Sequence, residues 1–309
     1  MYFASYLCCI CATNALGQYS GTHFIGTGQQ FVKIQDAVDS LVTYGVNGPV
    51  LMLIKTGNYN EQVNILPISG ASATNRVTFR SETMNPLNVR IFWGASTSSA
   101  NYVVNFNDCD YVSIEYLEIV NSTLNSSYTT VIGFNGTAEY NTISHNRLIG
   151  KSGTPTTDIE SIIYSNRKVI NNTEISYNQI LGGSYAVRFY VYNFSTETSN
   201  GAKVNYNQCE SPRGIFLNGQ DKVEVIGNQI TNDNGDGIQL YSCDEDIKVF
   251  NNVIKSIGNY THSGIYLNDS DGSIAFRGMV ANNVVYVTGV TTAENSGIKL
   301  YNSGYQDIY

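Results

Sequence analysis

The chain has 309 residues, of which 42% are hydrophobic and only 14% are charged, against roughly 25% charged in an average soluble domain. Asn, Ser, Thr, Tyr and Gly carry the polarity instead, which favours a β-rich protein over long helices built from Ala, Leu, Glu and Lys. The net charge is −8, and no basic stripe is present to neutralise phosphates, so nucleic acid is not expected as a partner.

The first residues predict a targeting segment. Residues 2–12 form an apolar run of the length of a signal-peptide core, and Ala15-Leu16-Gly17 resembles a small-x-small cleavage site. We therefore expect residues 1–17 to be a signal peptide and the mature protein to be secreted or held at the cell surface. The usual basic n-region is missing, so a hydrophobic N-terminal strand is the alternative. No other stretch is long and apolar enough to span a bilayer.

Half of the six cysteines fall in the predicted signal peptide. An odd number of widely spaced cysteines is not a disulfide framework, and no Cys-x-x-Cys spacing indicates a metal site. We expect the remaining three, Cys109, Cys209 and Cys243, to be buried free thiols.

Residues 18–65 predict an N-terminal cap and the first strands. A short amphipathic helix is expected first, because apolar residues recur at helical spacing. Such a helix would cover the open edge of the first coil, which is otherwise an aggregation hazard. The expected elements are, in chain order, a helix with Ile34, Ala37, Val38 and Leu41 on one face, an apolar strand at 49–54, a turn at Gly57-Asn58, and a strand containing Val63 and Ile65.

Two short motifs then recur in residues 66–309, with a period of about 28 residues. The first reads Gly-Ile-x-Leu-polar and begins at Gly214, Gly237, Gly264 and Gly297. Weaker copies of it have their first aliphatic residue at Val104, Ile132, Ile162 and Val187. The second motif reads aliphatic-x-x-Asn-x-aliphatic and contains Asn146, Asn178, Asn207, Asn228, Asn252 and Asn283.

Two period-2 strands in each variable-length repeat predict a β-solenoid, in which stacked coils bury a core that one coil cannot bury alone. Ile215, Ile238, Ile265 and Ile298 should stack rung on rung, about 4.8 Å apart. Each recurring Asn should lie at a turn and bond to the backbone and to the Asn residues above and below it. The uneven period indicates loops that leave the stack without breaking it.

The sequence resembles a known superfamily over roughly residues 31–309. Ile34-Gln35-Asp36-Ala37-Val38, followed by Gly57-x-Tyr59-x-Glu61, resembles the opening of pectin-lyase-like proteins. The later Gly-Ile-x-Leu and Asn-x-Ile rungs resemble their right-handed parallel β-helix repeats. The resemblance implies an all-β parallel β-helix with a short N-terminal capping helix. It implies no single function, because the superfamily contains lyases, hydrolases, esterases, epimerases, tailspikes and adhesins.

The end of the chain predicts an incomplete last coil. Ile298 begins a coil and Asp307-Ile308 begins its second strand, after which the sequence stops without a capping element. We therefore expect the natural protein to continue beyond Tyr309. A capping helix or a closed final coil would contradict this expectation.

Two catalytic hypotheses follow from the acidic and basic residues. The resemblance implies clustered Asp residues in hydrolases of the superfamily, and Asp233 and Asp236 could form such an acid–base pair. The Gly-His-Gly and Arg-x-Lys motifs that accompany such clusters are absent. The alternative is that both Asp residues only form an Asn- and Gly-rich turn.

The second hypothesis is a lyase-like or hydrolytic constellation on three consecutive coils. Arg213, Asp236 and Ser263 each lie two residues before the first inward aliphatic residue of their rung, and His262 lies three before. His262 would act as base, Arg213 as charge neutraliser and Asp236 as acid or metal ligand. The alternative is a solvated edge with an incidental ion pair.

Outward positions of the same strands predict a platform for sugars. Aromatic rings stack on the C–H faces of sugars, while amide and guanidinium groups bond to hydroxyls. The alternative is that exposed Tyr rows merely stabilise a β-surface. The predicted platform comprises Arg188, Tyr190, Phe216, Asn218, Gln239, Tyr241, Tyr266, Asn268, Lys299 and Tyr301.

No cofactor is certain, but Ca²⁺ could bind at the Asp-rich turns 244–246 or 268–271, although neither has the spacing of a known calcium loop. The alternative is that both turns are solvated. We predict an extracellular protein that binds or processes a polysaccharide or glycan, with lyase and hydrolase chemistry both open. A non-catalytic adhesin or structural stalk is the main alternative, and a trimeric tailspike is a third.

Overall fold

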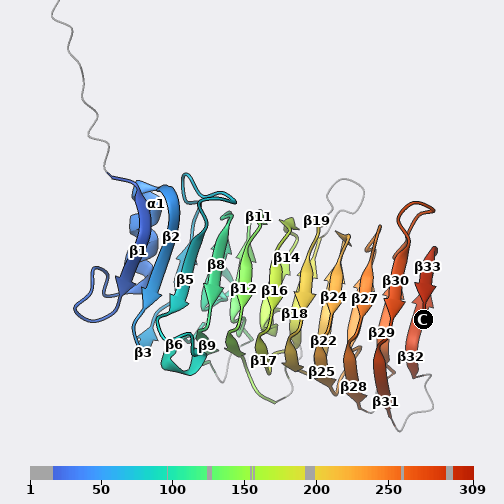
Figure 1. The fold of residues 1–309 in the computed structure, drawn as a ribbon. Helices are drawn as coiled ribbons and strands as arrows, with labels where there is room; N and C mark the ends of the chain where they lie inside the picture. Colours follow the sequence, from blue (N-terminus) through green and yellow to red (C-terminus); the bar gives the residue numbers. More distant parts are fainter. Residues whose placement is uncertain are drawn as a thin grey trace, which may run out of the picture.

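The structure is a computed structural model that describes residues 17–95, 97–123, 127–153, 155, 157–191, 199–258, 261–289 and 295–309. The signal peptide predicted at residues 1–17 lies outside this part of the chain, apart from Gly17. The described residues form one stack of coils along a single axis, from α1 at the blue end to β33 at the red end (Figure 1).

Each coil passes in turn through three parallel sheets, here named A, B and C. Sheet A contains β1 (Tyr19–Ile25), β2 (Val46–Ile54), β5 (Val77–Ser81), β8 (Val112–Glu115), β12 (Thr142–Ser144), β16 (Glu174–Ser176), β20 (Lys203–Asn205), β24 (Glu224–Ile226), β27 (Lys248–Phe250), β30 (Gly278–Ala281) and β33 (Gln306–Ile308). Sheet B contains β3 (Gly57–Asn60), β6 (Val89–Trp93), β9 (Glu118–Asn121), β13 (Arg147–Ile149), β17 (Gln179–Leu181), β21 (Gln208–Glu210), β25 (Gln229–Asn232), β28 (Val253–Ile257) and β31 (Val284–Thr288). Sheet C contains β4 (Val63–Ile65), β7 (Val104–Asn107), β10 (Ile132–Asn135), β14 (Ile163–Asn166), β18 (Tyr185–Tyr190), β22 (Arg213–Asn218), β26 (Ile238–Tyr241), β29 (Ser263–Asn268) and β32 (Ser296–Tyr301).

Short elements decorate this stack. Two small parallel pairs, β11 (Ala138–Glu139) with β15 (Ile170–Asn171) and β19 (Ser199–Asn200) with β23 (Gln220–Asp221), lie between sheets C and A in the chain. The 3-10 turns are η1 (Pro86–Asn88), η2 (Ser98–Ala100) and η3 (Asp158–Glu160). The all-β parallel β-helix predicted from the repeats is therefore confirmed.

The predicted inward file is confirmed by the register of sheet C. Ile215 pairs with Ile238, Ile238 with Ile265, and Ile265 with Ile298. One weaker copy was placed one residue too early, since Ile163 and not Ile162 pairs with Ile132 and Val187. The reason is local: Ile162 is also fully buried, at the corner before the strand. Its side chain packs closely against Gly150 and Gly183, because a Cβ added at either glycine would lie 2.3 or 2.8 Å from Ile162 Cδ1.

The recurring Asn residues form a buried ladder, as the second motif predicts. At each step one side-chain Oδ1 accepts both the backbone N–H and the Nδ2–H of the Asn in the preceding coil, as Asn207 Oδ1 does from Asn178. The same two bonds link Asn146 to Asn178 and Asn207 to Asn228. Because buried polar groups must be satisfied, this ladder fixes the corner between sheets A and B.

The N-terminal cap is α1 (Ile34–Tyr44), which buries the four predicted apolar residues. The expected turn at Gly57-Asn58 is wrong, because these residues begin β3 and pair with β6. The Gly-x-Tyr-x-Glu motif has a structural role instead. Glu61 accepts the N–H groups of Ile34 and Gln35, each at 3.1 Å, and so satisfies the first turn of α1.

The remaining cysteines are buried and free, as predicted. Burial raises the pKa of Cys209 to about 12 and of Cys243 to about 12, and it raises that of Cys109 further. These thiols are therefore protonated at neutral pH and act as small core residues.

The last coil exposes positions that are buried in earlier coils. Ile298 is 37% exposed, whereas its partner Ile265 is fully buried, and Leu300 and Ile308 are exposed as well. No helix or strand covers them within the residues that the structure describes. The expectation that the natural protein continues beyond Tyr309 stays a prediction.

Candidate carbohydrate-binding face

The outer face of sheet C carries two files of side chains that run across successive coils. The first file, in order of pairing, is Tyr164, Arg188, Phe216, Gln239, Tyr266 and Lys299. The second file is Asn166, Tyr190, Asn218, Tyr241, Asn268 and Tyr301. The register thus brings every residue of the predicted platform onto one face and adds Tyr164 and Asn166.

The platform is not uniformly exposed. Arg188 is only 8% exposed and Asn218 is buried, although both occupy outward positions. Phe216, Gln239, Tyr241 and Tyr266 are partly exposed, and Tyr301 is more open still. The middle of the face is therefore covered and its C-terminal end is open.

Aromatic rings explain the burial of Arg188. Its guanidinium carbon lies 5.7 Å from the ring centroid of Tyr164, 5.9 Å from Tyr185, and 5.2 Å from both Tyr190 and Phe216. These distances are within the range of cation–π attraction. Sequence reasoning missed Tyr164 and Tyr185, and it treated Arg188 as an exposed hydrogen-bond donor.

A carboxylate from outside the repeats completes this cluster. Asp158, on η3, accepts from Arg188 Nη2 at 2.7 Å and lies 3.8 Å from Arg213 Nη1. Arg213 also lies over the ring of Tyr185, 4.9 Å from its centroid. Nε and Nη1 of Arg188 are buried and make no hydrogen bond within the structure. Two arginines thus share one carboxylate, and two buried donors of Arg188 have no acceptor among the described residues.

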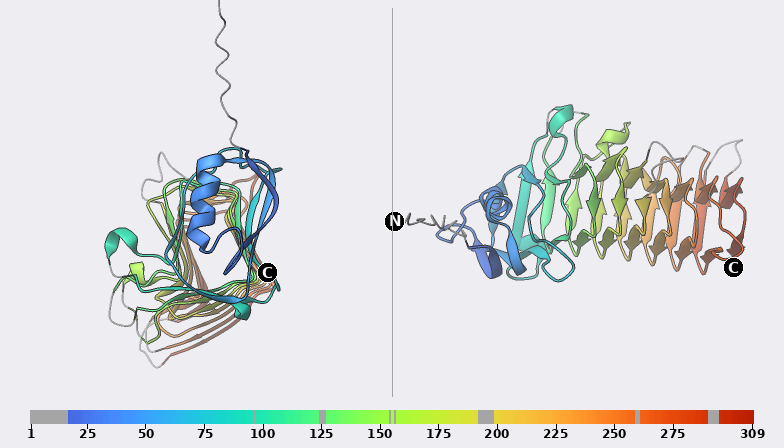
Figure 2. Two further views of the ribbon diagram at one scale, coloured as in Figure 1. Left: turned by 90° about the vertical axis from the view of Figure 1, so that its left-hand side faces the viewer. Right: turned by 90° about the horizontal axis from the view of Figure 1, so that it is seen from above.

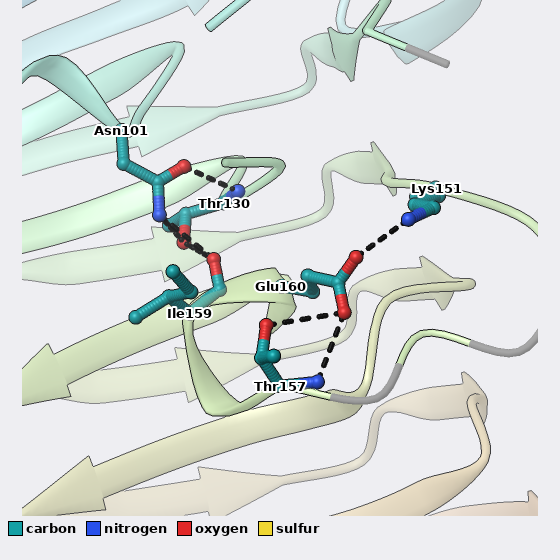
Figure 3. Close-up of polar contacts among 6 residues, drawn as sticks. All are labelled: Asn101, Thr130, Lys151, Thr157, Ile159 and Glu160. Carbon is teal, nitrogen blue, oxygen red and sulfur yellow. Dashed lines mark hydrogen bonds and ion pairs between the residues drawn. The ribbon is translucent and has the colours of Figure 1, made fainter. Parts of the chain in front are cut away.

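The segment around η3 is held in place by its own polar contacts (Figure 3). The backbone N–H and the hydroxyl of Thr157 both donate to Glu160 Oε2, at 2.9 and 3.1 Å, and Lys151 Nζ lies 2.6 Å from Glu160 Oε1. From the neighbouring coils, Asn101 Nδ2 and Thr130 Oγ1 donate to the carbonyl of Ile159, at 2.7 and 2.9 Å. These bonds on both sides of η3 fix Asp158 above the arginines.

A cleft lies next to this cluster on the same face. The inserts that carry η2 and η3 project from the same side of the stack (Figure 2). Between them is a cleft of about 230 Å³, whose floor includes Gly133 and Tyr164. Its remaining lining is Ser98, Asn101, Tyr128, Asn135, Ile159 and Asn166. Tyr164 belongs both to this cleft and to the ring cluster around Arg188, so the two features form one continuous surface.

The predicted catalytic residues are only partly brought together. Ser263 N–H donates to Asp236 Oδ1 at 2.6 Å, on adjacent coils. Burial raises the pKa of Asp236 above its ordinary value of 3.8, although the Ser263 N–H and the nearby His262, Lys299 and Arg213 act in the opposite direction. A carboxyl of this kind holds a proton more readily than an exposed Asp, which suits a general acid. Arg213, however, is engaged by Asp158.

Asp233 lies elsewhere. It lines a separate pocket of about 300 Å³, together with Glu210 and Ser211, at the corner between sheets B and C. Asp236 is not among the residues that line this pocket. The acid–base pairing of Asp233 with Asp236 stays a prediction.

The Asp-rich turns considered for Ca²⁺ are engaged in turn contacts. Asp244 Oδ1 accepts from the N–H of Asp271 at 2.8 Å, while Glu245 and Asp246 form ion pairs with Lys222 and Lys248. Across the described part of the chain, no group of three or more His, Cys, Asp and Glu side chains is placed to hold a metal ion. Ca²⁺ binding stays a prediction.

Together the fold and this face define a class: a parallel β-helix with an elongated outer face rich in aromatic and polar side chains. The family model of NosD, described as a periplasmic copper-binding protein, matches residues 162–309. No curated protein matches the chain.

Solved structures share the fold at low sequence identity. A lacto-N-biosidase from Eubacterium ramulus has a TM-score of 0.54 and 9% identity, over 93% of this chain and 67% of that one. A pectin methylesterase from Aspergillus niger has a TM-score of 0.46 and 12% identity, over 94% of this chain and 91% of that one. A pectate lyase has a TM-score of 0.45 and 12% identity, over 94% and 79%. The three parallel sheets and the likeness to the lacto-N-biosidase show that the chain has a parallel β-helix fold.

Copper binding does not fit the residues in the described part of the chain. The three His residues are far apart in the sequence and occupy different environments. His23 bonds to Gln30 and to the carbonyl of Ser20, His145 is stacked between two Tyr rings, and His262 is buried beside Asp236. A copper site needs several soft or imidazole donors at one point, and no such group of side chains is gathered in the described part of the chain.

No helix of the described residues has the length and apolarity that crossing a bilayer requires.

Proposed function

We propose that the protein is an extracellular or periplasmic carbohydrate-binding β-helix and that its ligand lies along the outer face of sheet C. The cleft between η2 and η3, which leads directly into the ring cluster around Arg188, carries this proposal. Aromatic rings offer apolar contact to sugar C–H groups, and the exposed amides of Asn135 and Asn166, which line the cleft, can bond to sugar hydroxyl groups.

The direction of the ligand follows from the two files of sheet C. Because equivalent side chains repeat on every coil, a chain of sugars laid along the axis meets Tyr164, Phe216, Tyr241 and Tyr266 in succession. The first two lie near the cleft, and the last two lie toward the open C-terminal end. A polysaccharide therefore suits this face better than a small, compact ligand.

Removing rings near the cleft tests this proposal. We expect Tyr164→Ala and Phe216→Ala each to weaken the retention of a bound soluble polysaccharide by about tenfold, because a ring contact of this kind contributes about 0.5–1.5 kcal/mol beyond its buried area. Affinity electrophoresis through gels that contain single polysaccharides measures the effect. The control is Tyr286→Ala, an exposed ring on sheet B. Equal retention of all variants would contradict binding at this face.

Catalysis at Asp236 is a second candidate, favoured by the raised pKa of this carboxyl beside His262. A panel of polysaccharides, with and without Ca²⁺, is assayed for unsaturated products and for reducing ends. If the group acts as a general acid, we expect Asp236→Asn to abolish turnover and wild-type turnover to fall as the pH rises through the elevated pKa, because the acid form is then lost. Unsaturated products would indicate a lyase, and reducing ends alone would indicate a hydrolase. No turnover from the folded protein would leave a binding protein, adhesin or stalk.

A further inference from the structure

A row of stacked rings lies on the corner between sheets A and B, away from the face of sheet C described above. The row consists of the residues that directly follow four neighbouring strands of sheet A, β8, β12, β16 and β20: Tyr116, His145, Tyr177 and Tyr206. The first three of these strands are labelled side by side in Figure 1. Consecutive ring centroids are 4.6, 5.0 and 5.1 Å apart, with interplanar angles of 19°, 16° and 12°. The rings therefore form one continuous stack across four coils.

The backbone at these positions is unfavourable for aromatic residues. All four have a positive φ, between 55° and 58°, a left-handed conformation that is costly for residues with a Cβ and is most easily adopted by Gly and Asn. The corresponding positions of the next three coils are Gly227, Asn251 and Asn282, also at positive φ. The fold alone is thus satisfied by Gly or Asn, and it does not require rings at this corner.

The row ends where Gly replaces the ring. A Cβ added at Gly227 would lie 2.5 Å from ring atoms of Tyr206, so the last ring packs against the backbone of Gly227 in the next coil. Tyr177 is 53% and Tyr206 is 49% exposed. Their hydroxyl groups form no hydrogen bond within the described residues. Because the ring faces are stacked on one another, what the row presents outward is a series of ring edges and hydroxyl groups at the spacing of the coils.

A second, shorter row lies on the other side of the same strands. Tyr111 and Tyr140 precede β8 and β12, stack with centroids 4.9 Å apart and planes 1° apart, and again have positive φ. Between the two rows, Ser113 and Ser144 point outward but are only 1% and 7% exposed. Arg76 covers part of this floor, since its Nη1 donates to Ser113 Oγ at 3.2 Å and its guanidinium carbon lies 6.0 Å from the centroid of the Tyr111 ring. We name the two rows and this floor the tyrosine band.

We infer that the tyrosine band is a second glycan-binding surface, separate from sheet C, and that its ligand is an ordered, insoluble β-1,4-linked polysaccharide. Identical groups repeated on each coil match a ligand that repeats at a similar interval, and an extended β-1,4-linked chain advances by a similar distance per sugar. The hydroxyl groups at the ring edges can bond to hydroxyl groups of such a chain. Single contacts of this kind are weak, but several made at once give strong retention through multivalency.

The test uses microcrystalline cellulose and crystalline chitin in pull-down assays with the whole chain. The variant is Tyr177→Asn combined with Tyr206→Asn, because Asn already occupies this position at Asn251 and Asn282 and should leave the fold intact. We expect wild type to bind at least one of the two solids and the double variant to bind at least tenfold less. The control is again Tyr286→Ala, which should bind as wild type does.

Two further measurements separate this inference from the proposed function. Tyr164→Ala should lose soluble polysaccharide but keep its binding to the solid, and the double Asn variant should show the reverse. Absence of binding to both solids, or unchanged binding by the double variant, would overturn the inference. Light scattering supplies the other contrary outcome: if the same double variant abolishes a concentration-dependent dimer, the band is an interface between two copies of this chain.

Discussion

Asn207→Ala should destabilise the protein by about 3–4 kcal/mol, measured as the free energy of unfolding in denaturant. Asn207 is buried and sits in the middle of the ladder. Its Oδ1 accepts two bonds from Asn178, and its Nδ2 donates to the carbonyls of Ile175 and Asn205 and to Asn228 Oδ1. Alanine leaves the Asn178 N–H and the Ile175 carbonyl without partners in a place that water cannot reach, and each such group costs about 1–3 kcal/mol.

The neighbouring Gln208 is the matched control. Its amide is exposed on β21 and makes no side-chain hydrogen bond in the described part of the chain. Gln208→Ala should change the free energy of unfolding by no more than about 0.5 kcal/mol. Similar losses for the two variants would mean that the ladder contributes nothing beyond ordinary side-chain packing.

The fold could be predicted from the sequence because every coil meets the same physical requirement. Each strand must place alternate aliphatic residues inward and stack them on the coil below, so positions such as Ile215 and Ile238 recur and the repeat is visible. The ladder was visible for the same reason, since a buried Asn is useful only when the next coil has one as well. What the period does not encode, such as the start of β3 at Gly57, was missed.

The candidate site was only half predictable. Period-2 alternation placed Phe216 and Tyr266 outward correctly, as the register of sheet C shows. Tyr164 was missed because its rung was read one residue out of frame: two adjacent aliphatic residues, Ile162 and Ile163, both looked inward. Asp158 was missed because it lies in an insert, and inserts have no counterpart in the other coils from which to infer their position.

The sequence contains a signal for the tyrosine band, but the structure is needed to interpret it. Tyr177 and Tyr206 stand immediately before a ladder Asn, as His145 does, so aligning the coils on that Asn places them in one file. The sequence gives no indication that the position has a positive φ. Only that conformation shows that Gly and Asn meet the backbone requirement of this corner at least as well as an aromatic residue does.

The glycines that open the rungs of sheet C provide a second large and specific effect. These positions need no positive φ; what they need is space. A Cβ added at Gly214 would lie 1.9 Å from the carbonyl oxygen of Gly237 in the next coil. That oxygen accepts the N–H of Ile215 at 2.9 Å, so it cannot move away without breaking the hydrogen bonding between coils. Gly297, at the same position of the last rung, has no atom within 4 Å of its added Cβ.

We therefore expect Gly214→Ala to destabilise the protein by about 3 kcal/mol or more, because the methyl group forces two coils apart. Gly297→Ala should be neutral or should stabilise by up to about 1 kcal/mol, since alanine lowers the entropy of the unfolded chain where its conformation is compatible. Denaturant unfolding of both variants shows whether glycine is needed for the conformation of its own strand or for the close contact between coils. If both lose stability equally, these glycines serve the conformation of their own strand; if only Gly214→Ala does, the close contact between coils requires them.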